Sequence, residues 1–121
     1  MTNKTNRESE LLEIYYKNLG EGYFLTELQN YSKGQGFGLG DIWCVFAGEL
    51  EQWEEGYFGE TGVAYFYDYP AVEKYEVLVV DYRVFFGFLQ EVSNVFVERN
   101  PSCKEQVNEY LLKIKTTYSL G

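Results

Sequence analysis

Apolar residues recur at helical spacing near the start of the chain, and short polar or glycine-containing stretches separate them from the next apolar runs. The first apolar stripe consists of Leu11, Leu12, Tyr15 and Leu19. This spacing predicts an amphipathic helix that ends before Gly20. Thr5 to Glu8 reads as a capping box at its start, because Glu8 can reach back to the Thr5 amide. A second, shorter helix is predicted from Phe24 to Tyr31.

The last third of the chain has the same helical period. Asp81 is placed to cap a helix over 82–98, whose apolar stripe consists of Phe85, Phe88, Leu89, Val92, Val95 and Phe96. Asn100 is predicted to cap the next helix, with Pro101 at its first position. This terminal helix is expected over 102–115, with Cys103, Val107, Tyr110, Leu111 and Ile114 on one face.

Between these helices the pattern changes to short runs typical of strands. An antiparallel sheet of three or more strands is predicted, with strands at about 42–47, 62–67 and 75–80 and an additional one at 53–58. The run from Ile42 to Ala47 is nearly all apolar, as expected for a strand covered on both faces. The connections are short and contain glycine, which favours an antiparallel meander. Segregated helices and strands indicate an α+β fold, and 1–121 is assigned to a single domain. Two small sheets with peripheral helices are the alternative architecture.

The segment from Gly34 to Gly40 has glycine at every second position. Its spacing matches neither a dinucleotide-binding nor a Walker motif, and no Lys-Ser or Lys-Thr comes after it. It also leads into a strand, so it offers no helix N-terminus to an anion. We therefore expect a flexible or tightly turned surface loop.

Negative charge is concentrated in the middle of the chain. The net charge is −9, from 19 acidic and 10 basic residues. Residues 41–76 hold nine of the acids and one base, so this segment carries −8 while both flanks are close to neutral. Such a balance opposes direct binding of nucleic acids or anionic membranes and favours a basic partner. Net negative charge also keeps proteins soluble, but solubility gives no reason for this concentration.

The residue types available exclude several kinds of catalytic site. The chain has no histidine, which removes the usual general base and the commonest metal ligand. Cys44 and Cys103 are too few for a disulfide scaffold or a zinc site and are expected to be buried free thiols. Neither a cofactor nor a metal is predicted, and the calcium-loop spacing is absent. A carboxylate hydrolase stays open as an alternative, because acidic residues are abundant.

Aromatic residues lie among the acids of the central segment, and this mixture is typical of protein interfaces. Trp and Tyr serve as anchors, while surrounding carboxylates steer a basic partner into place. The predicted binding residues are Glu49, Glu51, Trp53, Glu54, Glu55, Tyr57, Glu60 and Asp68. An ordinary strand with Trp53 and Phe58 in the core and glutamates in water is the other interpretation.

From about Tyr23 to Ile114 the chain resembles immunity proteins of bacterial contact-dependent growth inhibition systems, above all those paired with ribonuclease toxins. The features that carry this resemblance are Trp43-Cys44-Val45-Phe46, the glutamate-rich segment, Gly62 to Phe66, the Val-rich strand, the aromatic helix Tyr82 to Glu98 and the Pro-started terminal helix. The resemblance implies an antidote that binds the C-terminal nuclease domain of one cognate toxin and blocks its RNA-binding or active-site cleft. It names no binding residues.

We also expect a cytoplasmic protein that is monomeric alone and forms a 1:1 complex with the toxin. The first ten residues are polar and unlike a secretory signal, and no apolar run approaches the roughly 20 residues that span a membrane. An acidic adaptor with a partner other than a toxin is the alternative function.

Overall fold

The computed structural model describes residues 3–120, with side chains from Arg7 onward. Its helices are α1 (Asn3–Leu19), α2 (Phe24–Ser32), α3 (Tyr82–Arg99) and α4 (Lys104–Thr117). Its strands are β1 (Gly38–Leu39), β2 (Ile42–Phe46), β3 (Val63–Tyr67) and β4 (Glu76–Val80). Short 3-10 turns, among them η2 (Ala47–Glu49) and η3 (Pro101–Cys103), complete the order. The predicted α+β class is confirmed.

The strands form one antiparallel sheet in the order β1-β2-β3-β4. Trp43 of β2 pairs with Phe66 of β3, which in turn pairs with Val77 of β4. The meander expected from the short connections is therefore confirmed, and the described residues do not form the alternative arrangement of two small sheets.

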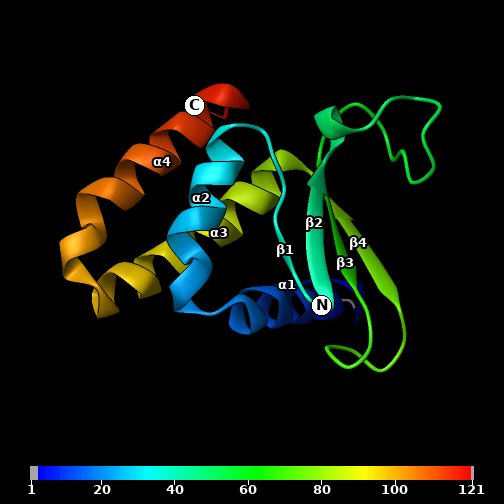
Figure 1. Cartoon of the computed structure of the whole chain (residues 1–121), viewed down its shortest axis with the longest axis horizontal. Coiled ribbons are helices and arrows are strands. Elements are labelled where there is room, and N and C mark those ends of the chain that lie inside the picture. Colours follow the sequence, from blue (N-terminus) through cyan, green and yellow to red (C-terminus); the bar gives the residue numbers. More distant parts are fainter. Residues whose placement is uncertain (1–2, 121) are drawn as a thin grey trace.

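All four helices lie on one side of the sheet or beneath its lower end, and the other side faces away from them (Figure 1). The core between sheet and helices is rich in aromatic rings. The Phe46 ring lies 5.2 Å from the Tyr31 ring, 5.2 Å from the Phe85 ring and 5.3 Å from the Tyr118 ring, measured between centroids. Aromatic side chains bury a large area per residue, which lets a chain of this length form a real core.

The strand predicted at 53–58 is wrong. This segment forms consecutive turns, and residues 51–56 are all exposed. Gly56 and Gly59 have φ angles of +91° and +125°, which an extended strand does not contain. The segment also has no neighbouring strand with which to pair.

The expectation that the 42–47 strand is covered on both faces is also wrong. Ile42, Cys44 and Phe46 are buried against the helices, whereas Trp43 and Val45 on the opposite face are only half-buried. Because every helix packs on the same side, no helix of the described chain covers the other face.

The helix ends follow the predictions in part. Asp81 caps α3 as predicted, with its Oδ1 accepting from the Val84 amide at 2.8 Å. Asn100 does not cap the next helix: its side-chain amide donates back to the Phe96 carbonyl, 3.0 Å away, at the end of α3. Helix α1 begins at Asn3, ahead of the predicted cap, and the Thr5 side chain lies outside the described residues.

Two further predictions concern side-chain burial. Cys44 is a buried free thiol as expected, and Cys103 is also free but only partly buried. Val95, predicted to lie in the apolar stripe of α3, is 51% exposed. The remaining predicted members of that stripe are buried or partly buried, so the prediction fails at this one position.

Candidate functional site

The loop between β2 and β3, residues 47–62, projects from one end of the sheet and holds most of the predicted binding residues. A hydrogen bond from the Ala47 amide to the Gly62 carbonyl, 3.0 Å long, closes its base. The Glu49 carboxylate then accepts from the amides of Gly36 and Phe46, both at 2.8 Å. Although Glu49 was predicted to bind a partner, the structure gives its carboxylate a role in holding two segments of the chain together.

The glycine-rich segment, residues 34–40, packs closely against β2. A side chain at Gly36 would meet the Cys44 carbonyl oxygen at 1.9 Å, and one at Gly38 would meet the Trp43 side chain at 2.5 Å. The segment is thus held tightly against β2, and β1 is part of it. Only glycine permits so close an approach of this segment to β2.

Two turns shape the outer part of the 47–62 loop. The Glu54 amide donates to the Glu51 carbonyl at 2.9 Å, and the Tyr57 amide donates to the Glu54 carbonyl at 3.2 Å. The Glu54 carboxylate accepts in return from the Glu51 amide at 2.9 Å. These bonds use the backbone and one carboxylate, and they leave the side chains of Glu51 and Glu55 exposed.

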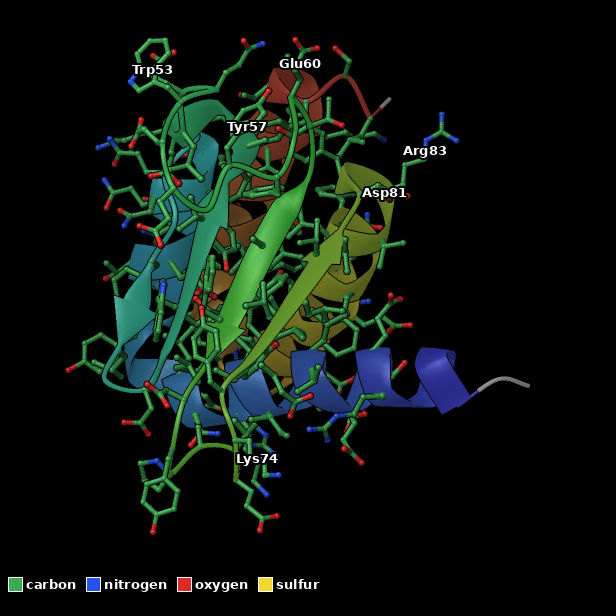
Figure 2. The ribbon with its side chains drawn as sticks, turned by 90° about the vertical axis from the view of Figure 1, so that its right-hand side faces the viewer. Trp53, Tyr57, Glu60, Lys74, Asp81 and Arg83 are labelled. Carbon is green, nitrogen blue, oxygen red and sulfur yellow. The ribbon has the colours of Figure 1, made fainter. Side chains whose placement is uncertain are left out.

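Trp53 lies at the tip of the loop, where its side chain points into solvent (Figure 2). It is 82% exposed, which is unusual for so large an apolar side chain. A shallow open hollow of about 400 Å³ lies beside it, lined among others by Leu50, Glu51, Tyr57 and Glu60. The residues 47–62 include five glutamates and no Lys or Arg. The structure therefore brings seven of the eight predicted residues into one acidic, aromatic loop.

Asp68 is the one predicted binding residue that lies outside the 47–62 loop. Asp68 follows the far end of β3, and its amide donates to the Asp41 carbonyl at 2.8 Å. Five residues of strand carry the chain roughly 15 Å, so the charge that is continuous in sequence is divided between the two ends of the sheet. Lys74, in the β3–β4 loop, lies at the opposite end from Trp53 and Glu60 (Figure 2). At this lower end Arg7 pairs with Glu76, which offsets part of the negative charge.

The sequence interpretation missed a second candidate surface, the outer face of the sheet. Trp43 and Phe66 stack there with ring centroids 5.3 Å apart and planes 4° apart. Tyr75, Val77 and Val79 lie beside them and are 56%, 46% and 48% exposed. A strict alternation of apolar and polar residues would have shown a solvated face, but these strands are apolar on both sides. Only the placement of the helices reveals which side is open.

A separate cluster of buried polar side chains lies in the core around Tyr15. Tyr15 Oη lies 2.8 Å from Glu27 Oε2, 2.8 Å from the Phe37 carbonyl oxygen and 3.3 Å from Cys44 Sγ. Burial raises the pKa of Glu27 to about 8 and that of Cys44 to about 12. Glu27 is 0% exposed, so its carboxyl group cannot reach a substrate. This cluster belongs to the core.

No group of three or more His, Cys, Asp or Glu side chains among the described residues is placed to hold a metal ion. Within the same residues, no helix combines the length and apolar character needed to cross a bilayer. What the described surface does present is an acidic loop with an exposed tryptophan, next to an uncovered apolar sheet face. Surfaces of this kind are typical of proteins that bind other proteins.

Comparison with known families identifies the class more closely. Residues 8–111 match the family described as CDI immunity protein, where CDI stands for contact-dependent growth inhibition. The match covers most of the chain, which therefore belongs to the CDI immunity protein family. No curated protein matches the sequence significantly. Membership in this family confirms the resemblance seen in the sequence and implies that the chain neutralises a CDI toxin by binding it.

Proposed function

We propose that this protein is a cytoplasmic immunity protein that binds the C-terminal nuclease domain, a ribonuclease, of one cognate CDI toxin. It forms a 1:1 complex and has no catalytic activity of its own. The acidic surface occupies the basic RNA-binding or active-site cleft of the toxin, so that RNA is kept out.

The observation that carries this proposal is the 47–62 loop, with five glutamates, no basic residue and Trp53 at its tip. A domain that cleaves RNA presents positive charge to the phosphate backbone of its substrate. A projecting loop of carboxylates offers the same sign of charge as phosphates and adds an aromatic anchor. Within this proposal the contact residues are Glu51, Trp53, Glu54, Glu55, Tyr57 and Glu60, with Glu49 holding the loop in place.

Asp68 is assigned no direct role in the loop contact, because it lies at the other end of the sheet. The carboxylates of the loop are exposed rather than enclosed in a pair. Glycoside hydrolysis uses two carboxyl groups that flank one bond in a defined site. Nothing in the described structure favours that alternative over binding.

The test uses the C-terminal domain of the toxin encoded directly upstream of this chain's gene. Wild-type protein is expected to bind that domain, to block its cleavage of RNA in vitro and to protect cells that express it. Changing Glu51, Glu54 and Glu55 together to Lys should weaken binding at least tenfold, because charges at an interface steer association. Reversal of Glu105 and Glu109, both exposed on α4, is the matched control and should leave binding nearly unchanged.

Glu54 also accepts a hydrogen bond within the loop, so thermal unfolding of both variants is measured alongside binding. If the α4 variant loses binding and the loop variant keeps it, the interface lies on another face. If the wild-type protein fails to bind the neighbouring toxin domain at all, the proposed function is wrong and the partner is a different protein.

A further inference from the structure

The open face of the sheet has the composition of a core but no cover. In β2 and β3, residues on both faces are apolar, a pattern typical of strands that are buried on both sides. The helices bury only one side, which contains Ile42, Cys44 and Phe46 from β2. Six of the ten large apolar side chains exposed in the described chain belong to the sheet or its end loops: Leu39, Trp53, Tyr69, Tyr75, Val77 and Val79.

The register places the central part of this surface on one continuous patch. Trp43 is opposite Phe66, and Phe66 is opposite Val77, so the three lie side by side across the sheet. Val79 lies two residues further along β4, on the same face. The Tyr75 ring is 6.5 Å from the Trp43 ring and extends the patch downward. Figure 2 views the molecule from this side, with the helices behind the strands.

Carboxylates border the patch at both ends. The five glutamates of the 47–62 loop lie beyond one end of the strands. At the other end, Asp41, Asp68 and Glu73 lie in the turns together with one base, Lys74. A partner that fits must combine an apolar centre with basic residues on two sides. A second copy of this chain does not meet that requirement, because a face-to-face pair would bring two such acidic borders together.

We infer that the outer sheet face, centred on Trp43, Phe66, Val77 and Val79, is the central apolar contact for the cognate toxin domain. The 47–62 loop and the carboxylates of the lower turns form the charged border of that contact. This inference rests on the proposed function and adds to it the surface that holds the complex together. Apolar and aromatic residues at the middle of an interface set its lifetime, whereas the charged border sets how fast it forms.

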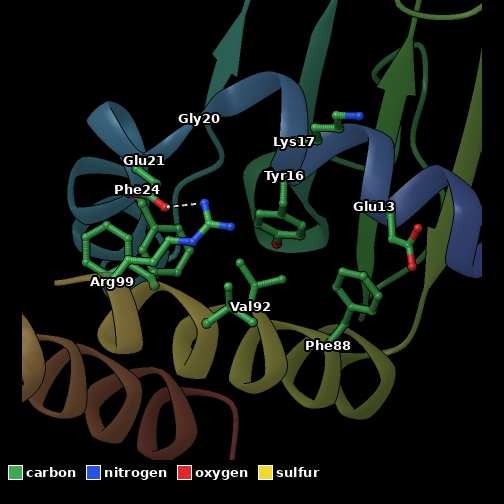
Figure 3. A pocket seen from close by; sticks show the side chains of 11 residues that line it. Glu13, Tyr16, Lys17, Gly20, Glu21, Phe24, Phe88, Val92 and Arg99 are labelled. Carbon is green, nitrogen blue, oxygen red and sulfur yellow. Dashed lines mark hydrogen bonds and ion pairs between the residues drawn. The ribbon is translucent and has the colours of Figure 1, made fainter. Parts of the chain in front are cut away.

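A groove of about 590 Å³ between α1 and α3 is the competing apolar surface (Figure 3). Tyr16, Phe88 and Val92 point into it from the two helices. Its rim carries both signs of charge, and Arg99 pairs with Glu21 at 3.0 Å across it. A rim of mixed sign gives no preference for a basic partner. Val95 lines this groove, so a change at Val95 is the matched control for changes on the sheet face.

The experiment compares threonine variants at exposed valines, using the toxin domain encoded upstream. Threonine keeps the β-branched shape and the preference for strands, but it places a hydroxyl group where a methyl group was. Val79→Thr and Val95→Thr alter side chains of nearly equal exposure, 48% and 51%. The double variant Val77→Thr/Val79→Thr should weaken the toxin complex at least tenfold, chiefly through faster dissociation. Its association rate and the salt dependence of that rate should stay as in wild type.

Val95→Thr should bind as wild type does. If instead the double variant binds normally while the glutamate-to-lysine loop variant is impaired, the sheet-face inference is wrong and the proposed function stands. If only Val95→Thr loses binding, the apolar contact for the toxin lies at the groove between α1 and α3, and the sheet-face inference is wrong. Sedimentation velocity of the unbound protein supplies the last check: a wild-type dimer that the double variant dissociates would overturn the inference in favour of self-association. Far-ultraviolet circular dichroism of each variant establishes that the fold is intact.

Discussion

The hydroxyl oxygen of Tyr15 lies 2.8 Å from Oε2 of Glu27, inside a core where neither residue has any exposed surface. The same hydroxyl is 2.8 Å from the Phe37 carbonyl oxygen, and its one hydrogen can serve only one of these two acceptors. A protonated Glu27 resolves the conflict, because it donates to Tyr15, and Tyr15 then donates to Phe37. The hydrogen-bond geometry thus agrees with burial, which raises the pKa of Glu27 to about 8.

This relationship predicts that stability falls as pH rises through the neutral range. The ordinary pKa of Glu27 is 4.5, so between about pH 4.5 and pH 8 the unfolded chain releases a proton that the folded protein keeps. Linkage then lowers the free energy of unfolding across this window, by up to about 5 kcal/mol, and the curve levels off above pH 8. Urea unfolding at several pH values between 5.5 and 8.5 measures the slope.

The chain has no histidine, so little besides Glu27 and the α-amino group titrates in that window. Glu27→Gln keeps the size of the side chain and stays neutral at every pH. It should abolish most of the slope and exceed wild type in stability at pH 8. A wild-type curve that is flat from pH 5.5 to 8.5 would show that Glu27 is already ionised in the folded state.

A second prediction concerns the Glu49 carboxylate, which ties the acidic loop to the glycine-rich segment ahead of β1 and to the end of β2. Glu49→Ala removes the acceptor for the Gly36 and Phe46 amides and should cost about 1.5–3 kcal/mol, as is typical of hydrogen bonds to a charged group. Glu55→Ala is the control, since Glu55 is exposed and surface changes are usually within about 0.5 kcal/mol. Chemical denaturation checks both. Equal effects of the two changes would mean that the Glu49 contacts do not hold the loop.

Two glycines are predicted to respond to alanine in opposite directions. Gly36→Ala would place a methyl group 1.9 Å from the Cys44 backbone oxygen and should destabilise the protein by about 3 kcal/mol or more. Gly87 lies inside α3 with open space around it, so Gly87→Ala should stabilise by about 0.5–1 kcal/mol. Midpoints of thermal unfolding show whether each variant is more or less stable than wild type. A Gly36→Ala protein as stable as wild type would contradict the close packing of the glycine-rich segment.

The last prediction is that salt slows formation of the toxin complex. Screening shortens the Debye length from about 30 Å at 0.01 M salt to about 3 Å at 1 M, so steering by the acidic loop is lost. Raising salt over that range should slow association at least tenfold, as measured by stopped-flow fluorescence. The variant with Lys at positions 51, 54 and 55 should lose most of this dependence, whereas reversal at 105 and 109 should keep it. An association rate that salt does not change in the wild type would remove electrostatic steering from the mechanism.

Much of the fold was readable from local patterns. The helices around Tyr15 and Phe85 and the cap at Asp81 depend on neighbours in sequence, and their residue spacing predicts them. The strands at Ile42, Val63 and Glu76 are likewise short β-prone runs bounded by turns. The segment from Trp53 to Phe58 has similar composition but forms turns, because positive φ angles at Gly56 and Gly59 break it and no strand lies beside it.

The candidate site was likewise predicted only in part from the sequence. The sequence alone determined that acids and aromatic residues gather between Asp41 and Glu76, and that histidine chemistry is absent. The tertiary structure decided that these acids lie at two ends of a sheet, because β3 carries the chain from one end to the other. It also decided that Trp43 and Phe66 face outward. Apolar residues on both faces of a strand look alike in sequence, and only the packing of every helix on one side determines which face stays open.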